Sequence, residues 1–169
     1  IACGKKENSN QQSYQEDLTA YVNPFIGTGE HGHTFPGATR PFGMVQVSPV
    51  NGTGGWDWVS GYHYSDSVMV GFGHLHLSGT GIGDLLDLLV MPTNKKLDLT
   101  KETKDRDELP YKSSYTHANE SASPGYYQVY LETPKVNAEV SSTLRTGFHR
   151  YTFDENEEQS LIMDLGFAL

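Results

Sequence analysis

The sequence contains a single cysteine, Cys3, in 169 residues, so no disulfide framework can form within the chain. Lysine and arginine are scarce: 12 of them stand against 21 aspartates and glutamates, and the formal net charge is -9 at pH 7. Because binding to nucleic acid requires a basic surface, this balance argues against nucleic acid as a partner. No segment approaches the roughly 18 consecutive apolar residues that a membrane-spanning helix needs.

Helical periodicity is missing too, since no window of about a dozen residues carries an apolar stripe with the helical period. Eighteen glycines and eight prolines favour turns and short elements instead. We expect a short strand over 42–50 and a buried strand over 85–92. The clearest alternation lies in "GYYQVYLETP" and "KVNAEVSSTLRTGFHRYTF", where the inward-facing set comprises Tyr127, Val129, Leu131, Val136, Ala138 and Val140.

This period-two alternation is typical of antiparallel strands with one face on a core, and the short break "TPKVN" predicts a hairpin. The fold class is therefore all-β, an antiparallel β-sandwich. We assign it to residues 18–169 and expect it to be incomplete at the C-terminus. The final stretch "QSLIMDLGFAL" ends in or just after an apolar strand, which would leave a sheet edge unpaired. The natural protein is expected to continue beyond Leu169.

The first 17 residues are interpreted separately, as the end of a lipoprotein signal followed by a flexible tether. "IACGKKENSNQQS" places a small residue before Cys3 and a polar tract after it. Lipidation of Cys3 would give a multi-chain anchor to a membrane. The expected location is the bacterial cell envelope, on the outer-membrane surface or in the periplasm. The alternative is a stray thiol in a disordered leader.

The stretch "GFGHLHLSGTGIGDLLDLLVMP" (71–92) allows several kinds of chemistry. A phosphate loop is rejected, because no lysine follows the glycines and the chain continues as a strand rather than a helix. A nucleophilic Ser78 near His76 lacks the G-x-S-x-G elbow. The pairs "HGH" (31–33) and "HLH" (74–76), with His63, could suit zinc or copper, but their spacing matches no standard zinc pattern. Histidines also line sugar pockets.

A carbohydrate pocket is the fourth possibility, and "GGWDWVSGYHYSD" (54–66) favours it. Aromatic faces pack against the C–H groups of a sugar, while carboxylates and imidazoles take its hydroxyls. Some of these aromatics should belong to the core. Trp56 and Asp57 follow "TGG" and are the best pocket candidates.

Four blocks of the sequence resemble glycoside hydrolase family 92, the calcium-dependent exo-acting α-mannosidases. They are "YVNPFIGTGEHGHTFPGATRPFGMVQVSP", "GWDWVSGYHYSD", "GFGHLHLSGTGIGD" and "TGFHRYTF". The match covers roughly residues 20–166. The resemblance implies a two-domain enzyme, in which this sandwich precedes an (α/α) barrel domain and the active site lies in the cleft between them. One departure is Glu30, which stands where another glycine would be less surprising.

The reaction implied by the resemblance is the inverting hydrolysis of a terminal α-mannoside of a glycan, assisted by calcium. Both catalytic carboxylates and most calcium ligands would lie in the barrel domain, so no catalytic or metal-binding residue is assigned in this chain, which alone is expected to be inactive. The residues expected to contribute pocket walls are Trp56, Asp57, His31, His33, His74, His76, Ser78 and Thr80.

Two other hypotheses remain at this point. The chain could be a non-catalytic carbohydrate-binding module of the cell surface, or a sandwich that binds metal through its histidine pairs. Whether His74 and His76 touch substrate or only brace their loop is left open, as are the mannoside linkage and the oligomeric state.

Overall fold

The computed structural model describes residues 16–52, 54–83, 85, 87–100, 103, 105–154 and 158–167. Cys3 and the proposed tether up to residue 15 lie outside the described residues, and so does Leu169. Among the described residues, no helix is long and apolar enough to cross a membrane.

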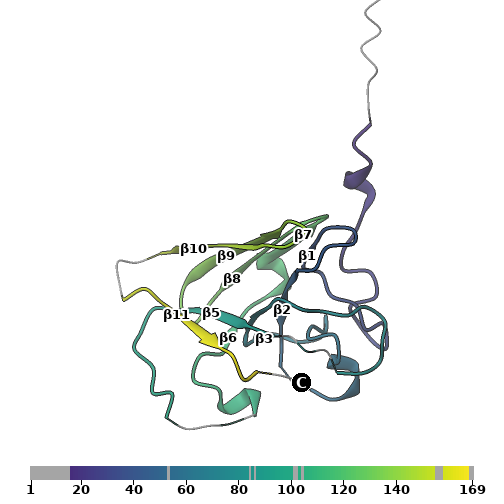
Figure 1. Ribbon diagram of the computed structural model, residues 1–169. Coiled ribbons are helices and arrows are strands. Elements are labelled where there is room, and N and C mark those ends of the chain that lie inside the picture. Colours follow the sequence, from purple (N-terminus) through teal and green to yellow (C-terminus); the bar gives the residue numbers. More distant parts are fainter. Residues whose placement is uncertain are drawn as a thin grey trace, which may run out of the picture.

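Two antiparallel sheets face each other as layers (Figure 1). The five-stranded sheet has the order β1 (Ala38–Thr39), β2 (Gln46–Val50), β4 (Gly71–Gly73), β5 (Leu89–Thr93) and β11 (Ser160–Asp164). The four-stranded sheet has the order β10 (Gly147–Phe153), β9 (Val136–Ser142), β8 (Tyr126–Leu131) and β7 (Glu120–Ser123). A separate pair joins β3 (Val68–Met69) to β6 (Ser113–Ser114).

The helical segments of the described residues are four single turns of 3-10 helix: η1 (Leu18–Tyr21), η2 (Trp56–Trp58), η3 (Arg106–Glu108) and η4 (His117–Asn119). The all-β prediction is therefore confirmed.

The core lies between the two sheets, and the alternation of β8 and β9 supplies much of it. Burial alternates with period two along both strands, and the six residues predicted to face inward are each at most 1% exposed. The two strands pair from Tyr126 opposite Ser141 to Leu131 opposite Val136, as the predicted hairpin requires. From the other sheet, Val47, Phe72 and Met91 enter the same core.

The two strands predicted before residue 100 are shorter than expected. β2 begins at Gln46 rather than at 42, because Phe42 has a φ of 60° and the amide of Gly43 bonds to the carbonyl of Arg40 in a turn. β5 begins at Leu89, since the preceding Leu88 has a φ of 58°. A non-glycine residue in this left-handed region interrupts an extended strand.

Candidate functional site

The first part of the site is the turn that carries Trp56 and Asp57. Gly55 precedes it with a φ of 112°, a conformation that favours glycine, and η2 then projects the indole outward, so that Trp56 is 58% exposed. The indole N–H donates to the carbonyl of Gly81 at 2.9 Å. This bond fixes the ring against the glycine-rich segment 79–83.

The second part is the loop that carries His31 and His33. Backbone packing here is very close: a Cβ on Gly32 would lie 2.0 Å from the carbonyl oxygen of Gly27, so a side chain at this position cannot be accommodated. The loop is tied to the glycine-rich segment, because the amide of Gly79 donates to the carbonyl of His33 at 2.6 Å. This bond holds the histidine loop beside the segment that also contacts Trp56.

Side chains from these segments meet at Asp57. Its Oδ1 lies 2.6 Å from Nδ1 of His31 and 3.7 Å from Nε2 of His33. The buried ring of His33 packs edge-on against Trp56, with ring centroids 4.3 Å apart. We call this group the loop site: His31, His33, Trp56, Asp57 and Gly81.

The charges of the loop site are set by the contact between His31 and Asp57. The hydrogen bond from His31 lowers the pKa of the Asp57 carboxyl, and the same bond raises the pKa of the exposed His31 imidazole. Asp57 is therefore ionised at neutral pH and can only accept hydrogen bonds. Nε2 of His33 is buried, has no hydrogen-bond partner among the described residues, and faces the same carboxylate.

Ser78 and Thr80 lie on the exposed segment that flanks the loop site. The glycines beside them, rather than their hydroxyl side chains, contact the loop site. The amide of Gly79 bonds to His33, and a Cβ on Gly81 would lie 3.5 Å from the Trp56 ring. The Thr80 hydroxyl donates to the carbonyl of Ile82 at 3.3 Å. Both residues are exposed.

His76 is a buried residue beneath the loops. Its Nδ1 donates to the carbonyl of Ser60 at 2.9 Å, and its ring packs on Phe35 with centroids 4.9 Å apart. Burial lowers the pKa of His76 to about 4. The neutral ring braces the loops, and its contacts lie with the protein rather than with the exposed surface.

His74 lies apart from the loop site, between the two sheets. Its Nε2 is 2.9 Å from Nε2 of His149 on β10, and its Nδ1 is 2.6 Å from the carbonyl of Leu88. A carbonyl only accepts, so His74 carries its proton on Nδ1 and His149 donates to it. Burial lowers the pKa of both rings, that of His149 to about 4. The structure therefore brings together His31, His33, Trp56 and Asp57, but not His74.

Several polar residues around the loop site hold the loops in place. Asp66 is buried and accepts from the indole of Trp58 at 2.9 Å, from the amides of Ser67 and Val68, and from the guanidinium of Arg106. The ring of Trp58 stacks on His63, with centroids 4.4 Å apart. The sequence analysis did not single out Arg106 or His149, because each is distant in sequence from its partner, which is Asp66 for Arg106 and His74 for His149.

The metal chemistry of these residues is limited. Among the described residues, no group of three or more histidine, cysteine, aspartate or glutamate side chains is placed to hold a metal ion. The loop site offers one carboxylate and two imidazoles, whereas calcium takes about six to eight oxygen ligands. The loop site by itself does not fit calcium.

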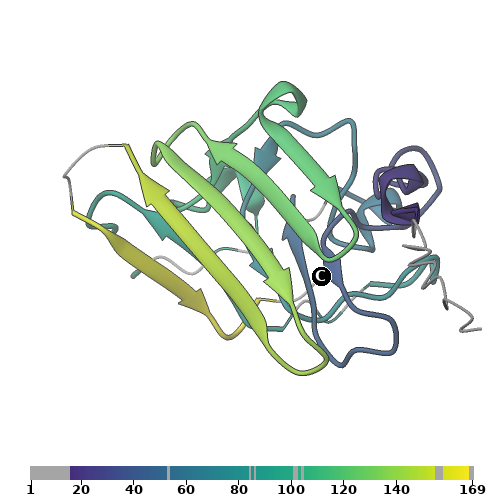
Figure 2. The ribbon, with the colours of Figure 1, turned by 90° about the horizontal axis from the view of Figure 1, so that it is seen from above.

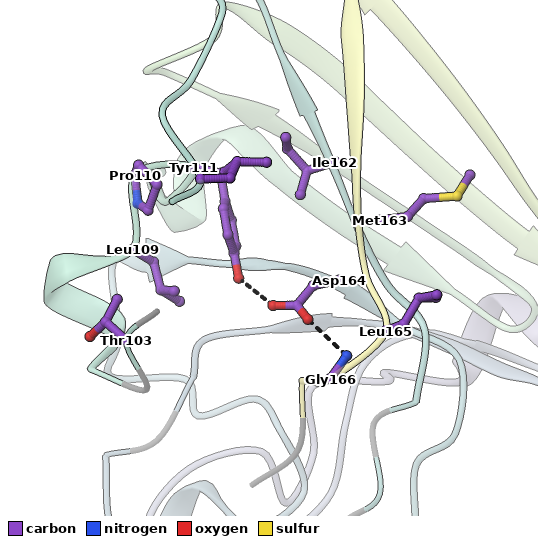
Figure 3. A pocket seen from close by; sticks show the side chains of 10 residues that line it. Thr103, Leu109, Pro110, Tyr111, Ile162, Met163, Asp164, Leu165 and Gly166 are labelled. Atoms are coloured by element: carbon purple, nitrogen blue, oxygen red, sulfur yellow. Dashed lines mark hydrogen bonds between the residues drawn. The ribbon is translucent and has the colours of Figure 1, made fainter. Parts of the chain in front are cut away.

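A hollow of about 750 Å³ lies elsewhere, beside the edge strand β11 (Figure 3). Apolar side chains dominate its lining, including Leu109, Ile162 and Leu165, and its main polar contact is the Tyr111 hydroxyl donating to Asp164 at 2.9 Å. It contains no residue of the loop site.

Comparison with known families gives one match over most of the chain. The family described as "Glycosyl hydrolase family 92 N-terminal domain" matches residues 21–169. A protein of Arthroderma benhamiae described as an uncharacterized secreted glycosidase is 28% identical over 152 residues, which are 87% of this chain and 19% of that protein.

Solved structures give the same result. A family GH92 α-mannosidase of Bacteroides thetaiotaomicron, in complex with mannoimidazole, is 42% identical with a TM-score of 0.84, over 91% of this chain and 20% of that one. An inverting mannosidase of the same family and organism is 31% identical with a TM-score of 0.71, over 86% of this chain and 19% of that one. The chain thus spans about a fifth of the length of these relatives.

Proposed function

The chain belongs to glycosyl hydrolase family 92, as an N-terminal domain of that family, and on this basis we propose that it forms part of the sugar pocket of an exo-acting, inverting α-mannosidase. The observation that carries the proposal is the convergence of Trp56, Asp57, His31 and His33 from separate loops. The proposed substrate is a terminal α-mannose of a glycan.

Each group of the loop site has a role in this proposal. The exposed indole of Trp56 packs against the C–H face of the terminal sugar. The ionised Asp57 accepts hydrogen bonds from the hydroxyls of this sugar, and hydrogen bonds to a charged group are stronger than those between neutral groups. His31 holds the carboxylate in position. Gly81, whose φ of 69° favours glycine, holds the indole in place through its carbonyl.

The chemical step belongs to the rest of the longer protein in this proposal. Inversion requires a general acid and a general base on opposite sides of the sugar, roughly 6.5–9.5 Å apart. Asp57 has a lowered pKa and no proton to give, so it does not suit the acid. We place both carboxylates and the calcium outside this chain, in the barrel domain, and the 169 residues alone are expected to release no mannose.

Secretion and anchoring are part of the same proposal. The secreted relative supports a place outside the cytoplasm. Lipidation of Cys3 in a bacterial envelope remains a prediction on a residue outside the described ones.

The test is the hydrolysis of an aryl α-mannoside by the full-length protein. Asp57→Asn and Trp56→Ala should each lower kcat/KM by about 10- to 100-fold, mostly through KM, because they remove contacts made to bound substrate as well as to the transition state. Asp98→Asn is the matched control, since Asp98 is an exposed carboxylate that caps its own turn through Thr100. Unchanged kinetics in both loop-site variants would contradict the proposal.

A further inference from the structure

The outer face of the four-stranded sheet carries an ordered row of side chains that the proposed function does not use. In the register of β8, β9 and β10, Ser141 lies opposite Tyr126 on one side and opposite Phe148 on the other. Residues directly opposite in antiparallel strands share a face. Figure 2 looks onto this face of the sheet. Two aromatic side chains therefore flank a small serine.

A hollow of about 180 Å³ lies over this row. Adjacent strands are about 4.8 Å apart, so the backbones that carry Tyr126 and Phe148 are about 10 Å apart. Between them lies Ser141, whose small side chain forms the floor of the hollow. Its hydroxyl donates to the carbonyl of Gly125 at 2.9 Å. Phe148 is 54% exposed, so one wall of the hollow is a half-exposed phenyl ring.

The next row along the strands is polar. Gln128, Glu139 and Arg150 lie opposite one another in the same register. The Glu139 carboxylate accepts from the Tyr126 hydroxyl at 2.5 Å and from Nε of Arg150 at 2.5 Å, and Nη2 of Arg150 makes a second bond. The Arg150 side chain is 73% exposed, whereas that of Glu139 is 11% exposed. The charges are paired, and the guanidinium still faces solvent.

These features select the chemistry of a ligand. Arg150 and Glu139 neutralise each other, so the hollow offers no unpaired charge to a charged ligand and suits a neutral one. The aromatic walls favour an apolar surface, and the amide, carboxylate and guanidinium beside them favour hydroxyl groups. A pyranose ring offers both, with C–H groups on its faces and hydroxyls on its rim.

We infer that this outer-sheet hollow, formed by Tyr126, Glu139, Ser141, Phe148 and Arg150, binds a neutral hexopyranose unit of a glycan. In this arrangement the ring lies over Ser141 between the two aromatic side chains, and its hydroxyls reach the exposed guanidinium of Arg150, which Glu139 holds in place. The hollow shares no residue with the loop site, so this inference does not rest on the proposed function.

The experiment is an NMR titration of the isotope-labelled chain with methyl α-D-mannopyranoside, methyl α-D-glucopyranoside and methyl α-D-galactopyranoside in turn. At least one glycoside should shift the amide signals of Ser141, Phe148 and Arg150 progressively. Phe148→Ala should weaken that binding by about fivefold or more. Ser141→Val, which fills the floor with a residue suited to a strand, should do the same without loss of fold.

Matched variants separate the two surfaces. Phe42→Ala removes a fully exposed phenyl ring from the loop before β2 and should leave the titration of the outer-sheet hollow unchanged. Trp56→Ala should also leave it unchanged. Shifts confined to the loop site would overturn the inference and leave the proposed function standing. The inference would also fail if another domain of the full-length protein covered the amides of Ser141, Phe148 and Arg150. The absence of shifts at the outer-sheet hollow with all three glycosides would overturn it as well.

Discussion

The four-stranded sheet and the loops between residues 27 and 83 differ in what holds them in place. Strands β7 to β10 are neighbours both in sequence and in the sheet, and apolar side chains alternate along β8 and β9. The loops instead depend on buried polar groups with distant partners. The side chain of Asn51, for example, accepts from the amide of His63 and donates to the carbonyl of Val68.

One carboxylate connects these two regions. Glu120, at the start of β7, accepts hydrogen bonds from the hydroxyls of Tyr62 at 2.8 Å and Tyr127 at 2.6 Å, and it also contacts His117. Tyr62 comes from the loops and Tyr127 from β8. The two regions therefore share one core and differ in the kind of contact that stabilises each of them. The loops should be most sensitive to loss of a buried polar group, and the sheet to loss of apolar volume.

The largest effect is expected for Asp66→Ala, in the loops. This change leaves the indole N–H of Trp58 and the guanidinium of Arg106 without their shared acceptor in a buried setting. Breaking a buried ion pair on one side costs about 3–5 kcal/mol. Urea unfolding followed by circular dichroism measures the loss. Asp98→Ala, which removes an exposed carboxylate, should change the free energy of unfolding by about 0.5 kcal/mol. Equal losses in both variants would show that the loops do not depend specifically on buried polar groups.

Burial of the His76 ring is expected to make the free energy of unfolding depend on pH. Burial holds its pKa at about 4 in the folded chain, below the ordinary 6.5. Between these values the unfolded chain takes up a proton that the folded chain does not, so stability falls as pH drops from 6.5 to 4. The loss is on the order of 3 kcal/mol and is absent above pH 6.5.

His76→Asn isolates this contribution, because an amide can keep the bond to the carbonyl of Ser60 but does not titrate. The slope of unfolding free energy against pH should flatten in the variant between pH 6.5 and 4. His31→Asn is the control: the pKa of His31 is raised by Asp57, so any stability it supplies is present at low pH and is lost as pH rises. Parallel pH curves for His76→Asn and the unchanged chain would show that burial of this ring is not the cause.

The same contrast explains how much could be predicted from the sequence. The faces of β8 and β9 follow from alternation alone, and the glycines before Trp56 predict its exposed position on a turn. The contact between His74 and His149 could not be predicted, because it depends on the packing of β10 over the end of β4. Arg106 lies 40 residues from Asp66, and nothing in its local pattern marks that partner. Period two specifies a face, whereas a buried polar partner is specified only by the finished fold.

The smallest effect tests the sheet. Val129 on β8 is fully buried between the layers, so Val129→Ala removes two methyl groups from the core and leaves a small cavity, at a cost of about 2 kcal/mol. Gln128→Ala, one position along and on the outer face, should change stability by about 0.5 kcal/mol or less in the same urea titration. If the Gln128 variant lost as much as the Val129 variant, polar contacts would stabilise the sheet as they do the loops. If the Val129 variant lost nothing, alternation would not report the core.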